Sequence, residues 1–354
     1  MLGTGIAKAR VSKGRPGVAR PSSKQVAVAE AVVRWYVATH FRRADEPGTP
    51  ALLFDPRHVG DFAVDRARVA AGDPQALFKL LVAMAMFQRR QDVQIMRILR
   101  GLSPRDAAEL SSSTELLRLA DLNACRESRS NASLLGSCDL AKDEDTGAGC
   151  CTANPRVNCY LKRHTVLLKR YGHFGKVPTS IALAVREAGA TDLPGLRAQI
   201  LGSIADPAAR AEALERALCA AWRVNQKIAC MFLSAVCNPD VSPGAAPWSE
   251  DVDWTKFVVV DSNVDLFLKS IKYQGLGTYD ARRAFIVALA EDIDLGALDA
   301  RLRSYNPRIV QQAFYVFMSA TNRRATTVDC MRAGVAACRA CPRSLRDRCL
   351  VRTL

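Results

Sequence analysis

The 354-residue sequence predicts an all-α fold. Apolar residues recur at helical spacing through most of the chain, as in residues 26–42 and 77–86. Helix-start signals precede such runs at Asp73-Pro74 and at Ser103-Pro104, where a capping residue is followed by a first-turn proline. Only the FVVV run at 257–260 looks like a strand, and it is too short to build a sheet. We expect it to be an extended lead-in to a helix.

Along the chain, residues 1–23 hold basic residues, no acid and many Gly, Pro and Ser, which favours a disordered basic arm. Residues 24–72 are expected to form N-terminal helices that pack with the C-terminal domain, beginning with a helix capped by Ser23. A helical domain is predicted over 73–260 and a second over 261–329. Their helices are expected at 158–171, 177–188, 207–221, 226–237, 262–271, 278–292 and 306–320, in addition to those that follow Pro74 and Pro104.

Residues 121–157 interrupt the helical pattern with Gly, Ser, Asn and Asp. We expect a long irregular insertion in the first domain. The insertion and its end hold Cys125, Cys138, Cys150, Cys151 and Cys159, whose spacing matches no established metal motif. Incidental thiols and a second metal site are both compatible with it.

The C-terminal segment 330–354 has four cysteines spaced C-x7-C-x2-C-x7-C among many arginines: Cys330, Cys338, Cys341 and Cys349. Four thiolates in so short a stretch can ligate one centre, and thiolate-only ligation selects zinc or an iron–sulfur cluster. Zinc ribbons usually pair two short knuckles, whereas this segment has one, between Cys338 and Cys341. The alternative is a set of buried or disulfide-bonded cysteines. The arginines predict a phosphate-contacting surface or a solvated basic tail.

Composition favours a polyanionic partner. Lys and Arg number 50 against 35 acidic residues, a formal charge of +15 with a sequence pI near 9.5. No apolar run is long enough to span a bilayer, and the N-terminus lacks the apolar region of a signal peptide. Twelve cysteines without a secretory signal indicate reduced thiols and metal ligands. We therefore expect a cytoplasmic, nucleoid-associated monomer with no membrane and no obligatory protein partner.

Two short segments carry candidate chemistry. A helix ending near 221, a tight turn and an apolar helix from Gln226 outline a helix–hairpin–helix, whose turn would offer backbone N–H groups to a phosphate. Lys227 falls in the first turn of the second helix, where the helix dipole disfavours a cation and so favours an amine nucleophile. Asp261 follows the FVVV run and can cap the next helix. In isolation, Lys227 reads as a surface lysine and Asp261 as a cap.

Together, VNQKIA at 224–229, VDSNV at 260–264 and the tetracysteine tail resemble the helix–hairpin–helix DNA glycosylase superfamily. The single inner knuckle is similar to the C-terminal [4Fe–4S] loop of the endonuclease III branch. Residues 73–92 resemble the first core helix of that superfamily, and 171–178 resemble the segment before its hairpin. The segments occur in the family order, and the resemblance covers most of residues 73–349.

The resemblance implies a bifunctional glycosylase and AP lyase that acts on double-stranded DNA carrying a damaged, oxidised base. Lys227 would attack C1′ of the flipped nucleotide, and Asp261 would stabilise the sugar cation and help to deprotonate the lysine. It also implies a [4Fe–4S] cofactor on the tail, with zinc as the fallback. The DNA contacts expected from the same resemblance are Gln88, Arg89, His173, Lys176, Arg223, Val224, Asn225 and Gln226.

The chain departs from the family pattern at two points. Arg223 and Asn225 stand where the hairpin usually has two glycines, and Arg tolerates the left-handed conformation poorly. Asp261 follows Lys227 by 34 residues, a longer interval than in the endonuclease III branch and more similar to the archaeal 8-oxoguanine glycosylase branch. The main alternative is a non-catalytic iron–sulfur or zinc DNA-binding protein. An RNA-directed protein is a third reading, disfavoured by an aromatic content of 6%.

Overall fold

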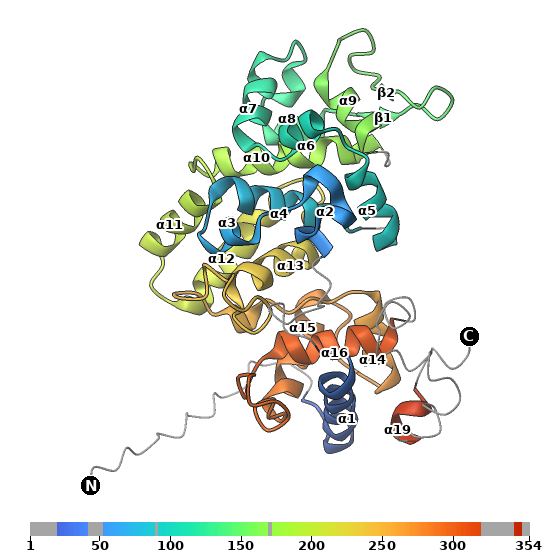
Figure 1. The fold of residues 1–354 in the computed structure, drawn as a ribbon, viewed down its shortest axis with the longest axis vertical. Coiled ribbons are helices and arrows are strands. Elements are labelled where there is room, and N and C mark those ends of the chain that lie inside the picture. Colours follow the sequence, from blue (N-terminus) through green and yellow to red (C-terminus); the bar gives the residue numbers. More distant parts are fainter. Residues whose placement is uncertain (1–19, 42–51, 89–90, 169–171, 320–342, 349–354) are drawn as a thin grey trace.

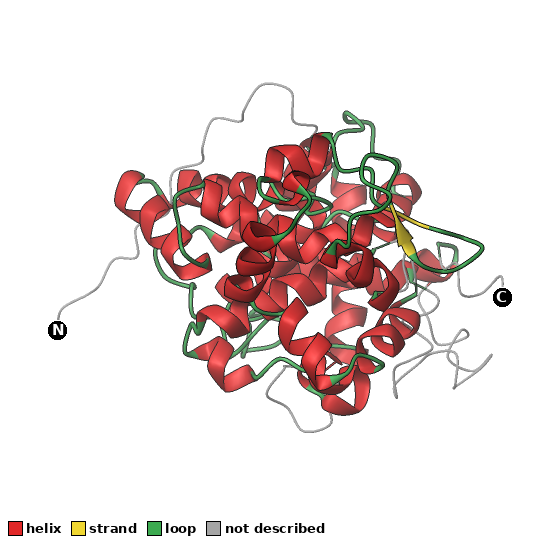
Figure 2. Cartoon of the chain, turned by 90° about the horizontal axis from the view of Figure 1, so that it is seen from above, coloured by secondary structure: helices red, strands yellow, loops and turns green. Residues whose placement is uncertain are grey.

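The computed structural model describes residues 20–41, 52–88, 91–168, 172–319 and 343–348. It consists of 62% helix and 1% strand, so the predicted all-α class is confirmed. Figure 2 shows helices throughout the body of the molecule and the one small pair of strands near its edge. The four tail cysteines, Arg89 and most of the N-terminal arm lie outside the described residues.

The first half of the described chain contains short helices around one long apolar helix, α4. Their bounds are α1 Ser23–Thr39, α2 Pro56–Val59, α3 Arg66–Ala70, α4 Pro74–Met86, α5 Asp92–Arg100, α6 Pro104–Leu110, α7 Ser113–Leu122 and α8 Asn131–Gly136. The second half contains α9 Tyr160–Leu167, α10 Val177–Glu187, α11 Leu193–Ser203, α12 Pro207–Cys219, α13 Gln226–Cys237, α14 Ser262–Ser270, α15 Tyr279–Glu291, α16 Pro307–Met318 and α19 Arg343–Arg346.

Most helices begin at a side-chain cap. Asp73 and Ser103 accept hydrogen bonds from the third backbone N–H of α4 and α6, and each is followed by the predicted first-turn proline. The first helix differs from the prediction by one residue, because Ser22 and not Ser23 is its cap. Ser22 forms a reciprocal capping box with Gln25, and this second interaction fixes the start of α1.

Two hydrophobic cores stack along the long axis of the molecule (Figure 1). The first surrounds α4, α10 and α13, and the second is formed by α1, α14, α15 and α16. The range 24–72 is divided between them. Residues of α1 pack in the second core, whereas Val59, Phe62 and Val69 pack in the first.

The FVVV run at 257–260 joins the two cores without pairing as a strand. Phe257 and Val259 belong to the first core, whereas Val258 and Val260 belong to the second. Alternate side chains of an extended backbone point in opposite directions, so these four residues can be buried on both sides. The run therefore has the composition of a buried strand, although it serves as the link that ends at Asp261.

The segment expected as an irregular insertion has little regular structure. Within it, strands β1 (Ala141–Lys142) and β2 (Gly149–Cys150) form a two-stranded antiparallel ribbon in which Ala141 pairs with Cys150. A third, small core lies beneath the ribbon and includes Cys125, Cys159 and Leu161. It stands at the end of the molecule opposite α19 (Figure 1).

In the parts of the chain that the structure describes, no helix combines the length and the apolar character needed to cross a bilayer.

Candidate functional site

The helix–hairpin–helix is predicted at α12 and α13, and the structure joins these two helices by residues 220–225. Asn225 caps α13, and its side-chain oxygen accepts the N–H of Ile228 at 3.1 Å. Arg223 has a φ of +63°, so the left-handed residue of the turn is an arginine at a position where the family usually has glycine. Asn225, at the second such position, is extended, with a φ of −90°.

The turn is held from behind by side chains of other helices. The amide nitrogen of Gln88 donates to the carbonyl of Arg223 at 2.8 Å, and that of Asn131 donates to the carbonyl of Ala220 at 2.9 Å. The hydroxyl of Ser180 accepts the Trp222 N–H at 2.6 Å. Gln88, expected to contact DNA, is thus engaged in fixing the hairpin conformation.

Lys227 is the second residue of α13 and is partly exposed. Its charge acts on Asp92, the first residue of α5: burial raises the pKa of the Asp92 carboxyl, and Lys227 opposes that rise. A half-buried carboxyl beside an accessible lysine is a pairing typical of functional sites. No local sequence pattern marks Asp92, because only the fold brings the start of α5 close to α13.

Asp261 is the N-cap of α14, and its carboxylate accepts the N–H of Val264 at 2.9 Å. It is partly buried and lies near Asp265, whose pKa is raised by burial and further by the charge of Asp261. Its charge also reaches Arg308, whose buried guanidinium donates to Gln311 and Gln312. The predicted cap is therefore present, with acidic and basic groups around it.

The first turn of α15 connects the surroundings of Lys227 and Asp261. Asp280 accepts from the side chain of Gln226, which precedes Lys227, at 3.1 Å. The Tyr279 hydroxyl donates to the Val258 carbonyl at 2.9 Å and accepts the Val260 N–H at 3.2 Å, one residue before Asp261. Among the described residues no hydrogen bond or ion pair joins Lys227 to Asp261 directly; adjacent residues of α15 hold their neighbours instead.

Lys176 and Val224, two of the predicted DNA contacts, have other surroundings in the structure. Lys176 is 2% exposed, and its ammonium donates to the carbonyls of Leu134 and Cys138. A buried lysine with these partners cannot reach a phosphate, so the prediction for Lys176 is wrong. Val224 is buried, and its N–H donates to the Ala221 carbonyl. It can shape the turn but offers no free donor to a ligand. His173 lies in the 3-10 turn Gly172–Lys176.

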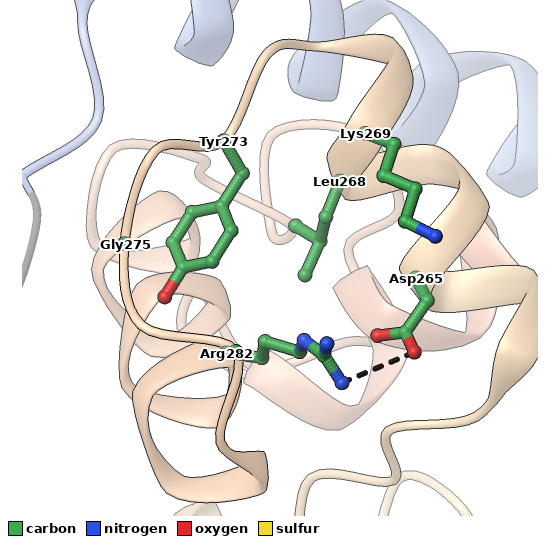
Figure 3. A pocket seen from close by; sticks show the side chains of 7 residues that line it. Asp265, Leu268, Lys269, Tyr273, Gly275 and Arg282 are labelled. Carbon is green, nitrogen blue, oxygen red and sulfur yellow. Dashed lines mark hydrogen bonds and ion pairs between the residues drawn. The ribbon is translucent and has the colours of Figure 1, made fainter.

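Two cavities lie on the second core. One, of about 150 Å³, is lined by Asp265, Lys269 and Tyr273, and Figure 3 shows Arg282 reaching across it to Asp265, at 3.1 Å. It is well below the roughly 300–1,000 Å³ of ordinary ligand sites. The other, of about 740 Å³, lies between α1 and the end of α14. Its lining residues include Arg20, Lys24, Lys272 and Arg348, and no acidic residue is among them.

The tetracysteine tail lies outside the described residues except for 343–348, in which α19 packs Leu345 into the second core. Within the described ranges no three His, Cys, Asp or Glu side chains already stand in ligand geometry for a metal ion. Comparison of the chain with models of known protein families, with curated proteins and with solved structures finds no match.

Proposed function

We propose that this protein is a base-excision DNA glycosylase with AP-lyase activity that removes a damaged, oxidised base from duplex DNA. The observation that carries the proposal is the position of Lys227 and Asp261. Each is at the N-terminal end of a helix. Asp280 of α15 binds Gln226, which precedes Lys227, and Tyr279 of α15 binds Val260, which precedes Asp261. An amine nucleophile and a carboxylate on one rigid frame are the groups that this reaction needs.

In the proposed reaction the damaged nucleotide is flipped out of the stack. The Lys227 amine attacks C1′ of the deoxyribose, and the bond from C1′ to the base breaks, with its electron pair leaving on the base. Asp261 stabilises the positive charge on the sugar. Opening of the sugar then gives a Schiff base between Lys227 and C1′, and loss of a C2′ proton expels the 3′ phosphate by β-elimination.

The charge of Lys227 acts on the Asp92 carboxyl, so Asp92 is a second candidate for accepting its proton. Burial raises the pKa of Asp92, which makes it a stronger base than a solvated aspartate. We assign the stabilisation of the sugar to Asp261. Either Asp261 or Asp92 accepts the proton of Lys227, and the variants described below distinguish the two.

Phosphate binding is proposed at two places. The first helical turn of α13 has backbone N–H groups without intrahelical acceptors, and Arg223 stands beside them in the turn. The basic groove between α1 and the end of α14 provides a longer track, because its cations occur without acidic neighbours in the lining. The tail residues Cys330, Cys338, Cys341 and Cys349 are proposed to bind a [4Fe–4S] cluster, with zinc as the fallback.

Borohydride trapping tests the activity. Duplexes carrying 8-oxoguanine, thymine glycol, uracil or an abasic site are incubated with the protein and reduced, and covalent adducts are counted on a denaturing gel. We expect an adduct with at least one duplex, and we expect it to disappear in Lys227→Ala. Lys142→Ala, an exposed lysine on β1, is the matched control and retains the adduct. An adduct that persists in Lys227→Ala refutes the assignment of the nucleophile.

Separate variants distinguish the carboxylates. Asp261→Asn is expected to slow base excision steeply, whereas Asp92→Asn is expected to weaken the pH dependence of trapping if it deprotonates the lysine. The second candidate function is a non-catalytic DNA-binding protein. It is favoured by the fact that the Asp261 side chain is already occupied as a helix cap. Tight, salt-dependent binding to every duplex with no adduct would support it over the enzyme.

A further inference from the structure

Four of the five cysteines in and next to the irregular insertion converge in one place. Cys125 and Cys159 are buried in the third core, and Cys138 packs against it. Asn154 contacts both Cys125 and Cys151, which places these two cysteines around one residue. We call Cys125, Cys138, Cys151 and Cys159 the thiol cluster.

Polar side chains hold the segments of the thiol cluster together. Asp139 accepts the Thr152 N–H at 2.9 Å, which keeps Cys138 and Cys151 next to each other in space although twelve residues intervene in the sequence. Asn154 donates its side-chain N–H to the sulfur of Cys125 at 3.5 Å, and its carbonyl accepts from Cys151 at 3.3 Å. The cluster is therefore fixed at both ends of the insertion.

A second amide points at the cluster from α7. The side chain of Asn123 donates to the sulfur of Cys159 at 3.2 Å and to the hydroxyl of Ser128 at 2.8 Å, and Ser128 in turn donates to the Cys125 carbonyl. Sulfur of a neutral thiol is a weak acceptor, whereas N–H donors around sulfur are a regular feature of metal-bound thiolates. Two amides directed at two buried sulfurs thus match a thiolate environment.

A buried cation stands beside the cluster. The Lys176 ammonium donates to the Cys138 carbonyl, and no carboxylate of the described chain is within ion-pair distance of it. Buried charges are normally matched by an opposite charge, and the charge of Asp139 acts on this lysine from beyond ion-pair distance. A metal centre with four thiolates has a net negative charge, and it would add to the negative charge that Asp139 already places near this lysine.

The core of the insertion is small. The third core has six buried residues, among them Leu134 of the short helix α8, and the ribbon over it consists of two-residue strands. Small units of this kind usually depend on a metal or on disulfides for stability. At Gly149 a Cβ would overlap the backbone of Lys162, so β2 lies directly against α9. This close contact brings the end of β2, and with it Cys151, toward Cys159.

We propose that Cys125, Cys138, Cys151 and Cys159 form a structural metal site that is separate from the C-terminal tetracysteine segment. Its chemistry is that of four soft thiolate ligands, which suits zinc or an iron–sulfur cluster. Metal binding draws the four sulfurs into ligand geometry and releases their protons. The site stands at the end of the molecule opposite α19 (Figure 1). The proposal is independent of the glycosylase activity.

The test is a metal count on the full-length chain. Native mass spectrometry and elemental analysis are applied to Cys341→Ser, which removes the contribution of the tail, and then to Cys341→Ser combined with Cys125→Ser or Cys159→Ser. We expect one zinc ion or one iron–sulfur cluster per chain in the single variant and none in either double variant. Visible absorption distinguishes the cluster from zinc. Cys341→Ser combined with Cys150→Ser is the matched control and keeps the metal, because Cys150 is outside the thiol cluster.

A second measurement on the unmodified chain separates loss of metal from loss of folding. The protein is alkylated before and after treatment with a chelator, and the modified cysteines are identified by peptide mass spectrometry. We expect the four thiols to be protected together and to become reactive together, while Cys150 reacts in both samples. The proposal is overturned if Cys341→Ser contains no metal, if the four thiols react without the chelator, or if any two of them are found as a disulfide.

Discussion

The ion pair between Arg283 and Glu215 gives a sharp test of how the frame around Lys227 is held. Arg283, on α15, contacts Glu215 on α12 and also Asp280 at 2.7 Å. Glu215 is 6% exposed, and its other contacts are neutral: Gln226 at 3.1 Å and the Cys230 thiol at 3.6 Å. Arg283→Met keeps a side chain of similar length but leaves the Glu215 carboxylate buried without a cation.

The size of the effect follows from burial. Removing one partner of a buried ion pair costs about 3–5 kcal/mol, because the remaining charge has lost both water and its counter-ion. The Arg283 side chain is 18% exposed, so water can partly replace it, and we expect a loss of about 3 kcal/mol in the free energy of unfolding. Replacing both residues, in Glu215→Leu with Arg283→Met, is expected to cost no more than about 1 kcal/mol, because no buried charge then remains.

Urea unfolding of the two single variants and the double variant, followed by circular dichroism, measures the free energies and closes a double-mutant cycle. The matched control is Arg34→Met, since Arg34 pairs with Glu30 at 2.9 Å on the exposed side of α1 and is 63% exposed. We expect the control to change the unfolding free energy by about 0.5 kcal/mol or less. A loss below about 1 kcal/mol in Arg283→Met, or a double variant as unstable as the single, would refute the reasoning.

Three further predictions concern other parts of the molecule. His164 is fully buried, and burial holds its pKa below the usual value near 6.5, so the unfolded chain binds the proton more readily. The contribution of His164 to the free energy of unfolding is therefore complete above pH ~6.5 and falls as the pH drops below it. His164→Gln should flatten a plot of the urea midpoint against pH between about 7 and 5. Arg223→Gly should be more stable than Arg223→Ala by about 1 kcal/mol in urea unfolding, because only glycine adopts a φ of +63° without strain. Equal stabilities would show that the turn changes conformation in one variant. Lys24→Gln should reduce the slope of log affinity for duplex DNA against log salt by about 1, and Lys142→Gln should leave the slope unchanged. A groove that does not bind DNA would give equal slopes for both.

Much of the helical framework could be predicted from the sequence because it is encoded locally. Asp73 and Ser103 predict the starts of their helices because they are capping residues. The periodic apolar residues after position 207 predict nearly the observed bounds of α12 and α13. Helix α11 was not predicted, although Asp192 caps it and a proline stands in its first turn. Its apolar residues are spread around the helix, so the periodicity that was used to find helices is weak there.

The environment of the candidate site was less predictable because it depends on long-range contacts. Lys176 and Lys227 are both lysines beside a helix start, yet one is buried against carbonyl groups and the other is accessible. The charge of a lysine side chain does not by itself indicate whether that side chain is buried. The partnership of Lys227 with Asp92 and the convergence of the thiol cluster likewise depend on packing between distant segments, which no local spacing indicates.

The thiol cluster and the turn between α12 and α13 meet at Lys176, which links the irregular insertion to the proposed DNA contact. The Lys176 ammonium lies 5.1 Å from the centre of the Trp222 ring, and the Arg223 guanidinium lies 5.3 Å from the same ring. The Trp222 ring thus contacts two cations. Lys176 is anchored on the insertion, and Arg223 belongs to the turn. Because Arg223 occupies a strained conformation, contacts of this kind must hold it there. A metal bound by the insertion would stiffen the anchor of Lys176 and so help to keep the turn in the shape that the proposed DNA contact requires.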